Sequence, residues 1–228
     1  MHTTAFRDPG IPDGEKSVYT VGIADQPHRF EVTSVVAHED DGYRSTVEMR
    51  PGDGDPTIRI EQRFQRVDGW LRAQDYRAET RSGDMVVSRE EAHFVDSTHL
   101  QFGSGIAPFP SNVMPIIGGL TLLRGLDFSE GAVESLDMWL AFSVHWPLVA
   151  RVAKQATVEV PAGRLSSWPV HLRPGFAHVN SFLDKVIGGL IPSSVAHFDA
   201  APPHRLVRFN FPTEVMPSDP RGLMELVT

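Results

Sequence analysis

The sequence predicts a mainly β protein: a single antiparallel β roll or barrel, lipocalin-like in form, with two short helices. Three observations support this prediction. Apolar and polar residues alternate with period two through most of the first half, which is typical of strands with one solvent-facing side. Turn-like stretches separate these runs, as in an antiparallel meander. Two Gly-containing apolar segments, near residues 112–124 and 181–191, are predicted to be the helices.

The strand prediction is clearest in TIRIEQRFQR (57–66). Ile58, Ile60 and Phe64 share one face of this run, and charged or amide residues occupy the alternate positions. EKSVYTVGIA (15–24), HRFEVTSVVA (28–37) and GYRSTVEMR (42–50) alternate in the same way. The intervening DDG, GDGDP, VDG and RSGD have the composition of turns. The first half is therefore expected to be a series of hairpins.

The pattern changes in the second half. Ser111 is expected to cap a helix over roughly Val113–Leu123. Strands resume in ESLDMWLAFSVHW (134–146), where alternate positions are apolar. VEVPAGRLSSW (158–168) predicts a hairpin that turns at Pro-Ala-Gly, with Gly163 at positive φ. The last predicted strand is HRLVRFNFP, and the tail after Pro212 is predicted to be loop.

Length and composition point to one domain over residues 1–228, with its core at about 12–212 and a loop tail at 213–228. The net charge of −8 argues against nucleic acid or an anionic membrane as partner. The lack of cysteine excludes disulfides, thiol catalysis and thiolate metal sites. No basic start followed by an apolar run is visible, and no apolar run reaches the roughly 18 residues of a membrane span. We therefore expect a cytoplasmic protein without a membrane span.

Four segments occur in a suggestive order: GEKSVY (14–19), FPSNVMPIIGGLTLLRGLDFSEG (109–131), VEVPAGRLSSWPVHL (158–172) and HFDAAPPHRLVRFNF (197–211). In this order the chain resembles the bacterial family known as domain of unknown function 3108, over about residues 12–212. The resemblance implies a curved antiparallel β roll, distantly lipocalin-like, with helices near one opening. It implies no established reaction. Members of the family are commonly exported, whereas this chain begins without a visible signal.

Motifs for cofactors and metals are lacking. There is no P-loop, no Gly-x-Gly-x-x-Gly and no His-Glu-x-x-His, and the ten histidines form no tight cluster. We therefore expect no cofactor and no metal. The more informative signal is polar residues on otherwise apolar strand faces: Gln62 shares its face with Phe64, and Arg72 and Tyr76 share parity with Trp70. Such residues hydrogen-bond to one another, are turned outward by a bulge, or orient a ligand in an apolar cavity.

The third alternative predicts a site. An internal cavity is expected to be lined by the ligand-binding residues Tyr43, Phe64, Trp70, Met138 and Phe142. Its polar contacts and catalytic candidates are Gln62, Arg72 and Tyr76, and antiparallel pairing should bring Gln62 within reach of Tyr76. As an enzyme, the protein would use Tyr76 or Gln62 to donate a hydrogen bond to a substrate carbonyl. Arg72 would stabilise the developing negative charge.

Two main functions are compatible with these features. The first is a cofactor-independent cyclase or isomerase that folds a polyketide- or terpenoid-like molecule by proximity and orientation. The alternative is a non-catalytic lipid or small-molecule binding or carrier protein. Both imply an apolar small-molecule ligand as partner. A third hypothesis is a packed structural domain with a protein partner, in which the interior would be filled.

Overall fold

The structure is a computed structural model that describes residues 4–24, 26–50, 56–101, 105–141, 144–175, 193–213 and 220–228. These residues form strands and two short 3-10 helices. In chain order the elements are β1 (Phe6–Arg7), β2 (Glu15–Ile23), β3 (Arg29–Glu39), β4 (Gly42–Arg50), β5 (Thr57–Val67), β6 (Trp70–Ser82), β7 (Met85–His93), β8 (Thr98–Gln101), β9 (Gly105–Pro108), β10 (Val113–Pro115), η1 (Gly118–Leu120), η2 (Leu122–Gly125), β11 (Val133–Ala141), β12 (Val144–Val152), β13 (Ala156–Val160), β14 (Gly163–Pro174), β15 (Ser194–Asp199), β16 (Leu206–Pro212) and β17 (Arg221–Leu226).

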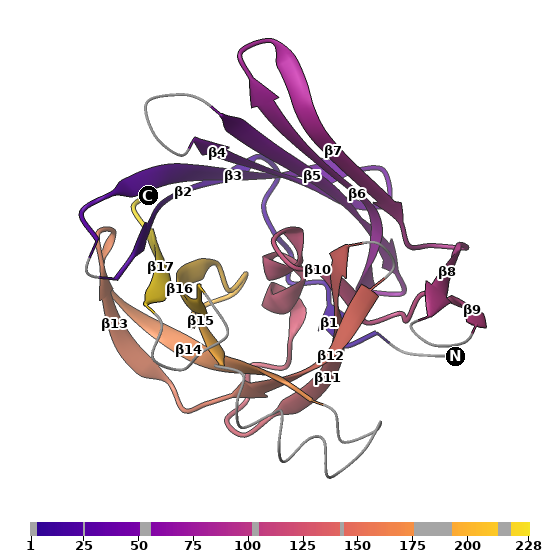
Figure 1. Cartoon of the computed structure of the whole chain (residues 1–228). Coiled ribbons are helices and arrows are strands. Elements are labelled where there is room, and N and C mark those ends of the chain that lie inside the picture. The colour runs from indigo at the N-terminus through magenta and orange to yellow at the C-terminus, as the bar shows by residue number, and fades with distance from the viewer. Residues whose placement is uncertain are drawn as a thin grey trace.

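One large sheet curls around the interior of the molecule (Figure 1). Its strand order is β1-β6-β5-β4-β3-β2-β17-β16-β15-β14-β12-β11-β10, with β7 paired to β6 and β13 paired to β14. The described ladders of this sheet are antiparallel, except that β10 runs parallel to β11. The prediction of a mainly β, mainly antiparallel fold is confirmed. Among the described residues no ladder joins β10 to β6 or β1, so a closed barrel is not shown.

Aromatic side chains pack between the two ends of the sheet. Tyr76 on β6 contacts Trp139 on β11 edge to face, with ring centroids 5.1 Å apart. Phe94, which follows β7, contacts Trp139 at 5.5 Å and Phe109 at 5.1 Å in the same edge-on manner. Such pairs are favourable because the edge of one ring meets the electron-rich face of the next. Side-chain packing thus holds together two ends that share no backbone ladder among the described residues.

The alternation seen in the sequence matches the two faces of the sheet. On β5, Ile60 and Phe64 are almost fully buried, while Arg59 and Arg63, each directly before one of them, are exposed. β5 pairs with β4 and β6 on either side. In a pleated strand, successive side chains point to opposite faces, so this pattern puts the apolar residues inside the curl.

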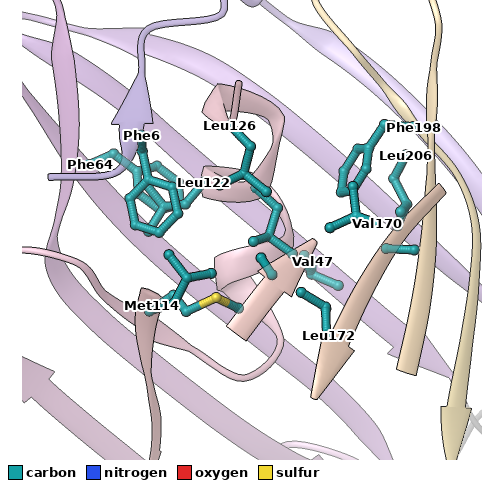
Figure 2. Packing of buried hydrophobic residues seen from close by; sticks show 14 of the residues in the cluster. Phe6, Val47, Phe64, Met114, Leu122, Leu126, Val170, Leu172, Phe198 and Leu206 are labelled. Atoms are coloured by element: carbon teal, nitrogen blue, oxygen red, sulfur yellow. The ribbon is translucent and has the colours of Figure 1, made fainter. Parts of the chain in front are cut away.

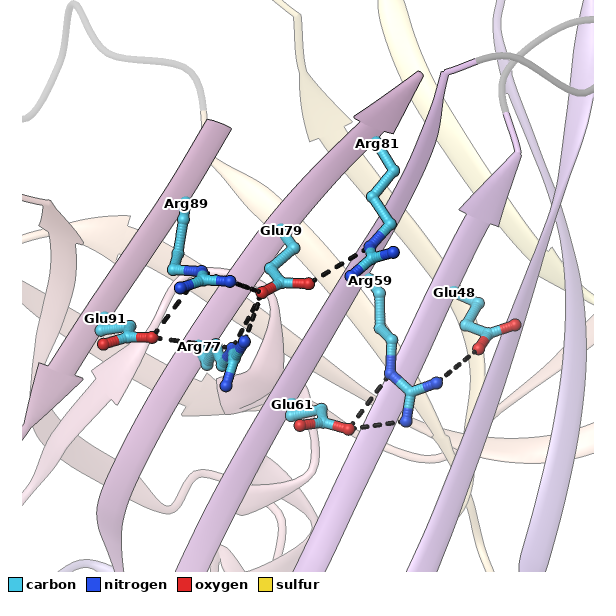
Figure 3. Close-up of polar contacts among 8 residues, drawn as sticks. All are labelled: Glu48, Arg59, Glu61, Arg77, Glu79, Arg81, Arg89 and Glu91. Carbon is cyan, nitrogen blue, oxygen red and sulfur yellow. Dashed lines mark hydrogen bonds and ion pairs between the residues drawn. The ribbon is translucent and has the colours of Figure 1, made fainter. Parts of the chain in front are cut away.

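The outer face of β4–β7 carries a ladder of arginines and glutamates (Figure 3). Glu79 lies at its centre and accepts hydrogen bonds from Arg77 and Arg89, while Arg81 lies 3.4 Å from its other oxygen. A hydrogen bond from Arg77 and further contacts with Arg89 outweigh the effect of burial and lower the pKa of Glu79 to about 2. The β6–β7 hairpin, which carries part of this ladder, extends beyond the rest of the sheet (Figure 1).

The helix predicted over Val113–Leu123 is only partly correct. Residues Val113–Pro115 form β10, and the helical segment is limited to η1 and η2, so Ser111 caps no helix. Pro115 lacks an N–H group, and the glycine pair of η1 weakens an α-helix, so parallel pairing with β11 prevails at 113–115. No helix in the described segments is long and apolar enough to cross a membrane. The predicted helix near 181–191 lies outside the described residues.

The helical segment lies inside the curled sheet, where the N-terminal segment packs against it (Figures 1 and 2). Phe6 is fully buried beside Phe64, close to Leu122. The backbone approach is close here, because a Cβ on Gly125 would lie 2.1 Å from the carbonyl oxygen of Arg7. Only glycine permits this contact. The interior around these residues is filled by side chains.

The predicted loop tail is wrong for its last residues. Arg221–Leu226 form β17, which lies between β16 and β2 near the middle of the sheet order. Met224 pairs with Val21 on one side and Phe209 on the other. The short run after Pro212 shows little alternation of its own, so its pairing with two long neighbours decides its conformation.

The late hairpin is confirmed. β13 pairs with β14, and Gly163 has a φ of 121°, which side chains with a Cβ rarely adopt. Val160 pairs directly with Gly163, so the loop consists of the two residues Pro161 and Ala162 instead of the expected three. The segment 134–146 also forms a hairpin, β11–β12, in which Met138 lies opposite Trp146.

Candidate functional site

A cavity of about 480 Å³ that is partly open to solvent lies next to the helical segment. A ligand pocket for a small molecule typically has a volume of a few hundred to about 1,000 Å³. The walls come from β2, β3, β4, β10, the segment from Ile116 to η2, and the strands β11 to β17 except β13. Most of the lining is apolar: Tyr19, Val21, Phe30, Val32, Val36, Val47, Met49, Met114, Ile116, Ile117, Leu120, Met138, Trp146, Leu148, Leu172, Pro174, Leu206, Phe209, Phe211, Pro212 and Met224.

Methionine is prominent in the walls. Four of the seven methionines of the chain, Met49, Met114, Met138 and Met224, line the cavity. The thioether is flexible and polarisable and adapts to apolar surfaces of irregular shape. The wall can therefore fit an apolar molecule without a rigid, single-shape pocket.

A buried ion pair forms part of the wall. Arg124 of η2 donates from Nη1 and Nη2 to the two carboxylate oxygens of Glu15 on β2, at 2.6 and 3.0 Å. Its Nε donates to the carbonyl oxygen of Pro203 at 2.9 Å. The Arg124 side chain is 5% exposed and the Glu15 side chain 15% exposed. A buried charge pair of this kind requires good geometry, which the two-pronged contact supplies.

Hydroxyl groups lie next to the ion pair. Ser17 is two residues after Glu15 on β2 and pairs with Ser34 on β3, and both line the cavity. Thr121, from between η1 and η2, also lines it and donates a hydrogen bond to Ser45 at 3.3 Å. These groups make this part of the cavity polar. One more hydroxyl, that of Ser194 on β15, also lines the cavity, and the other described lining residues are apolar.

The spacing of the helical segment explains how it meets this polar row. Residues three apart are eclipsed in a 3-10 helix, so Gly118, Thr121 and Arg124 share one face. Thr121 contacts Ser45 on β4, and Arg124 contacts Glu15 on β2. At Gly118 a Cβ would lie 1.8 Å from Oε1 of Gln62 on β5. The segment therefore crosses the strands with its polar face against their inward polar residues.

Tyr19 lines the cavity, and its hydroxyl group already has a hydrogen-bond partner. Its Oη donates a hydrogen bond to the carbonyl oxygen of Leu206 at 3.2 Å. Burial is the main cause that raises the pKa of Tyr19 above its ordinary value. The phenol thus remains neutral at physiological pH, and the charged groups of the described lining are Glu15 and Arg124.

Of the residues predicted to contact a ligand, Met138 lines this cavity. Gln62 and Tyr76 are direct cross-strand partners on β5 and β6, as the turn between them predicted. Both are buried, but neither belongs to the lining. Burial, with a smaller contribution from Glu90, raises the pKa of Tyr76 to about 12. Neither amide atom of Gln62 has a hydrogen-bond partner among the described residues.

Arg72 lies on the opposite face of β6 from Tyr76, contrary to the parity prediction. A register shift after Arg63 pairs Phe64 with Ala73 and Gln62 with Tyr76, which leaves an extra residue on β6. This bulge reverses the alternation, so Arg72 points outward, where it donates to Gln65 at 2.9 and 2.6 Å. It borders a smaller hollow of about 250 Å³ instead of the main cavity.

The other residues predicted to bind a ligand instead make contacts that stabilise the fold. Tyr43 donates a hydrogen bond to Asp8 at 2.5 Å and accepts one from the Ile11 N–H, which fastens the N-terminal segment. Phe64 packs in the filled part of the interior, and Trp70 is half-buried under the Arg7 guanidinium, 5.3 Å from the ring centroid. None of these three lines the cavity. Phe142 lies outside the described residues.

The polar residues of the cavity were missed, although the sequence carries a signal for them. Ser17 interrupts the apolar face of Tyr19 and Val21, and Ser34 does the same on the face of Val32. Serine is common on either face of a strand, so the signal is weaker than that of Gln62. Arg124 could not be found in this way, because its position follows from where the helical segment packs.

The described residues contain no cluster of three or more histidines and carboxylates that could hold a metal ion. The described lining of the cavity offers apolar side chains, hydroxyl groups and one ion pair.

No family model and no curated protein matches the chain. The resemblance to domain of unknown function 3108 thus stays a prediction. Among solved structures, a protein of Bacteroides fragilis NCTC 9343 with a YmcC-like fold is similar at 9% identity, with a TM-score of 0.35 and 98% of each chain covered.

Proposed function

We propose that the protein binds a predominantly apolar small molecule in the cavity next to the helical segment, as a binding or carrier protein. The observation that carries this proposal is a cavity of about 480 Å³ with mostly apolar walls and a few polar groups, most of them near the Glu15–Arg124 ion pair. Small-molecule sites share this composition: apolar area supplies affinity, and a small number of polar groups set the orientation of the ligand.

The test uses Nile red, an uncharged apolar dye, and a variant that fills the cavity. Ser34 on β3 points into the cavity, whereas its neighbour Thr33 lies on the other face of the same strand. We expect the wild type and Thr33→Phe to bind the dye with similar affinity. Ser34→Phe should bind it at least about tenfold more weakly, because the new ring occupies the space of the ligand.

Melting curves of both variants provide the control for folding. Equal binding by folded Ser34→Phe and the wild type would show that the dye binds elsewhere, and the lack of any saturable binding would refute the proposal. Val32→Trp, at a second wall position, repeats the test if Ser34→Phe does not fold.

A second candidate is a cofactor-independent cyclase or isomerase acting on a polyketide- or terpenoid-like molecule. One observation favours it: the carboxylate of Glu15 and the guanidinium of Arg124 border an apolar cavity, where charged groups act more strongly than in water. Gln62, Arg72 and Tyr76 do not line that cavity, so this candidate now depends on Glu15 and Arg124.

Incubation with farnesol, followed by chromatography and mass measurement of the recovered molecule, tests this candidate. Cyclisation or isomerisation would yield a new species of unchanged mass, formed by the wild type and not by Glu15→Gln. Unchanged farnesol that nevertheless binds in the cavity would favour the carrier function.

A further inference from the structure

The charged groups of the cavity neutralise each other. Both oxygens of Glu15 accept hydrogen bonds from Arg124, and the remaining Nε of Arg124 donates to the Pro203 carbonyl. Among the described lining residues no other side chain carries a charge at neutral pH. The wall therefore offers an incoming molecule no charge that lacks a counter-charge.

A charged head group would disturb this balance. A ligand carboxylate would compete with Glu15 for Arg124 and leave one negative charge in excess inside an apolar space. A ligand ammonium group would compete with Arg124 for Glu15 in the same way. An unpaired charge in such surroundings is costly, because it loses its water and gains no counter-ion.

Hydroxyl groups suit a neutral partner. Ser17, Ser34 and Thr121 border the cavity beside the ion pair, and a hydroxyl can donate or accept one hydrogen bond without a change in charge. Apart from Ser194 on β15, the rest of the described lining is aliphatic or aromatic or comes from methionine or proline. The arrangement matches a molecule with one uncharged polar end and an apolar body.

We propose that the cavity selects ligands with an uncharged polar end, such as an alcohol, and that the Glu15–Arg124 pair excludes carboxylates and amines. This inference rests on the proposed function and specifies its ligand class. Glu15 decides the preference against anions: without its charge, the same guanidinium would bind a carboxylate.

The experiment compares three ligands with the same chain, dodecanol, dodecanoate and dodecylammonium, as competitors of bound Nile red at about pH 8, where carboxylic acids are ionised. For the wild type we expect dodecanol to bind at least about tenfold more tightly than either charged ligand. Glu15→Gln should reverse the order of dodecanol and dodecanoate. Glu31→Gln is the matched control: it removes the same charge from an exposed position on β3 and should leave the order unchanged.

The double variant Glu15→Gln/Arg124→Met keeps the test decisive if Glu15→Gln folds poorly, because it leaves no unpaired charge. It should bind dodecanol and lose the gain in dodecanoate binding. Wild-type affinity for dodecanoate equal to that for dodecanol, or an unchanged order in folded Glu15→Gln, would overturn this inference while the cavity's binding function stands. Failure of all three ligands and of the dye to bind would instead refute the proposed function.

Discussion

Replacing Arg124 by methionine should destabilise the protein strongly. The change keeps an unbranched side chain of similar reach but removes the guanidinium, which is 5% exposed and makes three hydrogen bonds. Glu15 would then be left without its partner at a site where its side chain is only 15% exposed. Breaking a buried ion pair from one side costs about 3–5 kcal/mol. Because Glu15 keeps some contact with solvent, we expect about 3 kcal/mol.

Urea and thermal unfolding measure this effect. In a chain of this size, about 1 kcal/mol lowers the Tm by roughly 2–4 °C, so Arg124→Met should lower it by about 6–12 °C. Glu15→Gln/Arg124→Met should recover most of the loss, since neutral residues in place of a buried pair are often tolerated.

An exposed arginine supplies the matched control. Arg59 bonds to Glu61 at 2.6 Å on the outer face (Figure 3), but its side chain is 49% exposed. Arg59→Met should therefore cost about 0–1 kcal/mol. Equal destabilisation by Arg59→Met and Arg124→Met would refute the argument that burial makes the Glu15–Arg124 pair important. A double variant as unstable as Arg124→Met would refute the explanation by an unpaired carboxylate.

Three further changes test other parts of the fold. Gly163→Val should lower the free energy of unfolding by more than about 1 kcal/mol, because valine resists the φ of 121°, and an unchanged melting curve would contradict the turn geometry. Gln62→Leu should be neutral or raise that free energy by about 1 kcal/mol, since the buried amide has no partner among the described residues, and a clear loss of stability would show that it has one. The pKa of Glu79 is lowered to about 2 by Arg77 and Arg89, so its stabilising effect is present above the ordinary pKa and is lost as the pH falls toward 2. In urea unfolding the wild type should exceed Glu79→Gln in stability at neutral pH and lose this advantage in acid; a constant difference would contradict the shift.

Local alternation was sufficient to predict β2, β3, β4 and β5. Ile60 and Phe64 are inside and Arg59 and Arg63 outside, because a strand has only two faces and burial of apolar area selects one of them. The late hairpin was predictable for a similar reason, since Gly163 meets a local conformational demand that few other residues satisfy. The pairing of Gln62 with Tyr76 followed from the turn between their strands.

The residues of the candidate site could not be predicted in full, because they depend on features that the alternation of apolar and polar residues does not reveal. One extra residue on β6 turns Arg72 away from the face of Tyr76, and a bulge of this kind leaves no clear mark in the sequence. Met138 was the one described ligand candidate found in the cavity, because most interior positions of the other half of the curl are filled by Phe6, Phe64 and their neighbours. Strand parity predicts which side chains point into the interior, but it does not predict whether the interior at that position is packed or empty.

The sequence by itself thus determined that β2 to β5 are strands, which of their faces point inward, and where the late chain turns. Tertiary structure alone decided that Arg221–Leu226 completes the sheet between β2 and β16, and that Arg124 meets Glu15 across 109 positions of sequence. The physical reason is the sequence separation over which each effect acts. Alternation and turn preference act between residues close in the chain, whereas a cavity and its ion pair arise only where distant segments pack, and their energy depends on the burial that packing creates.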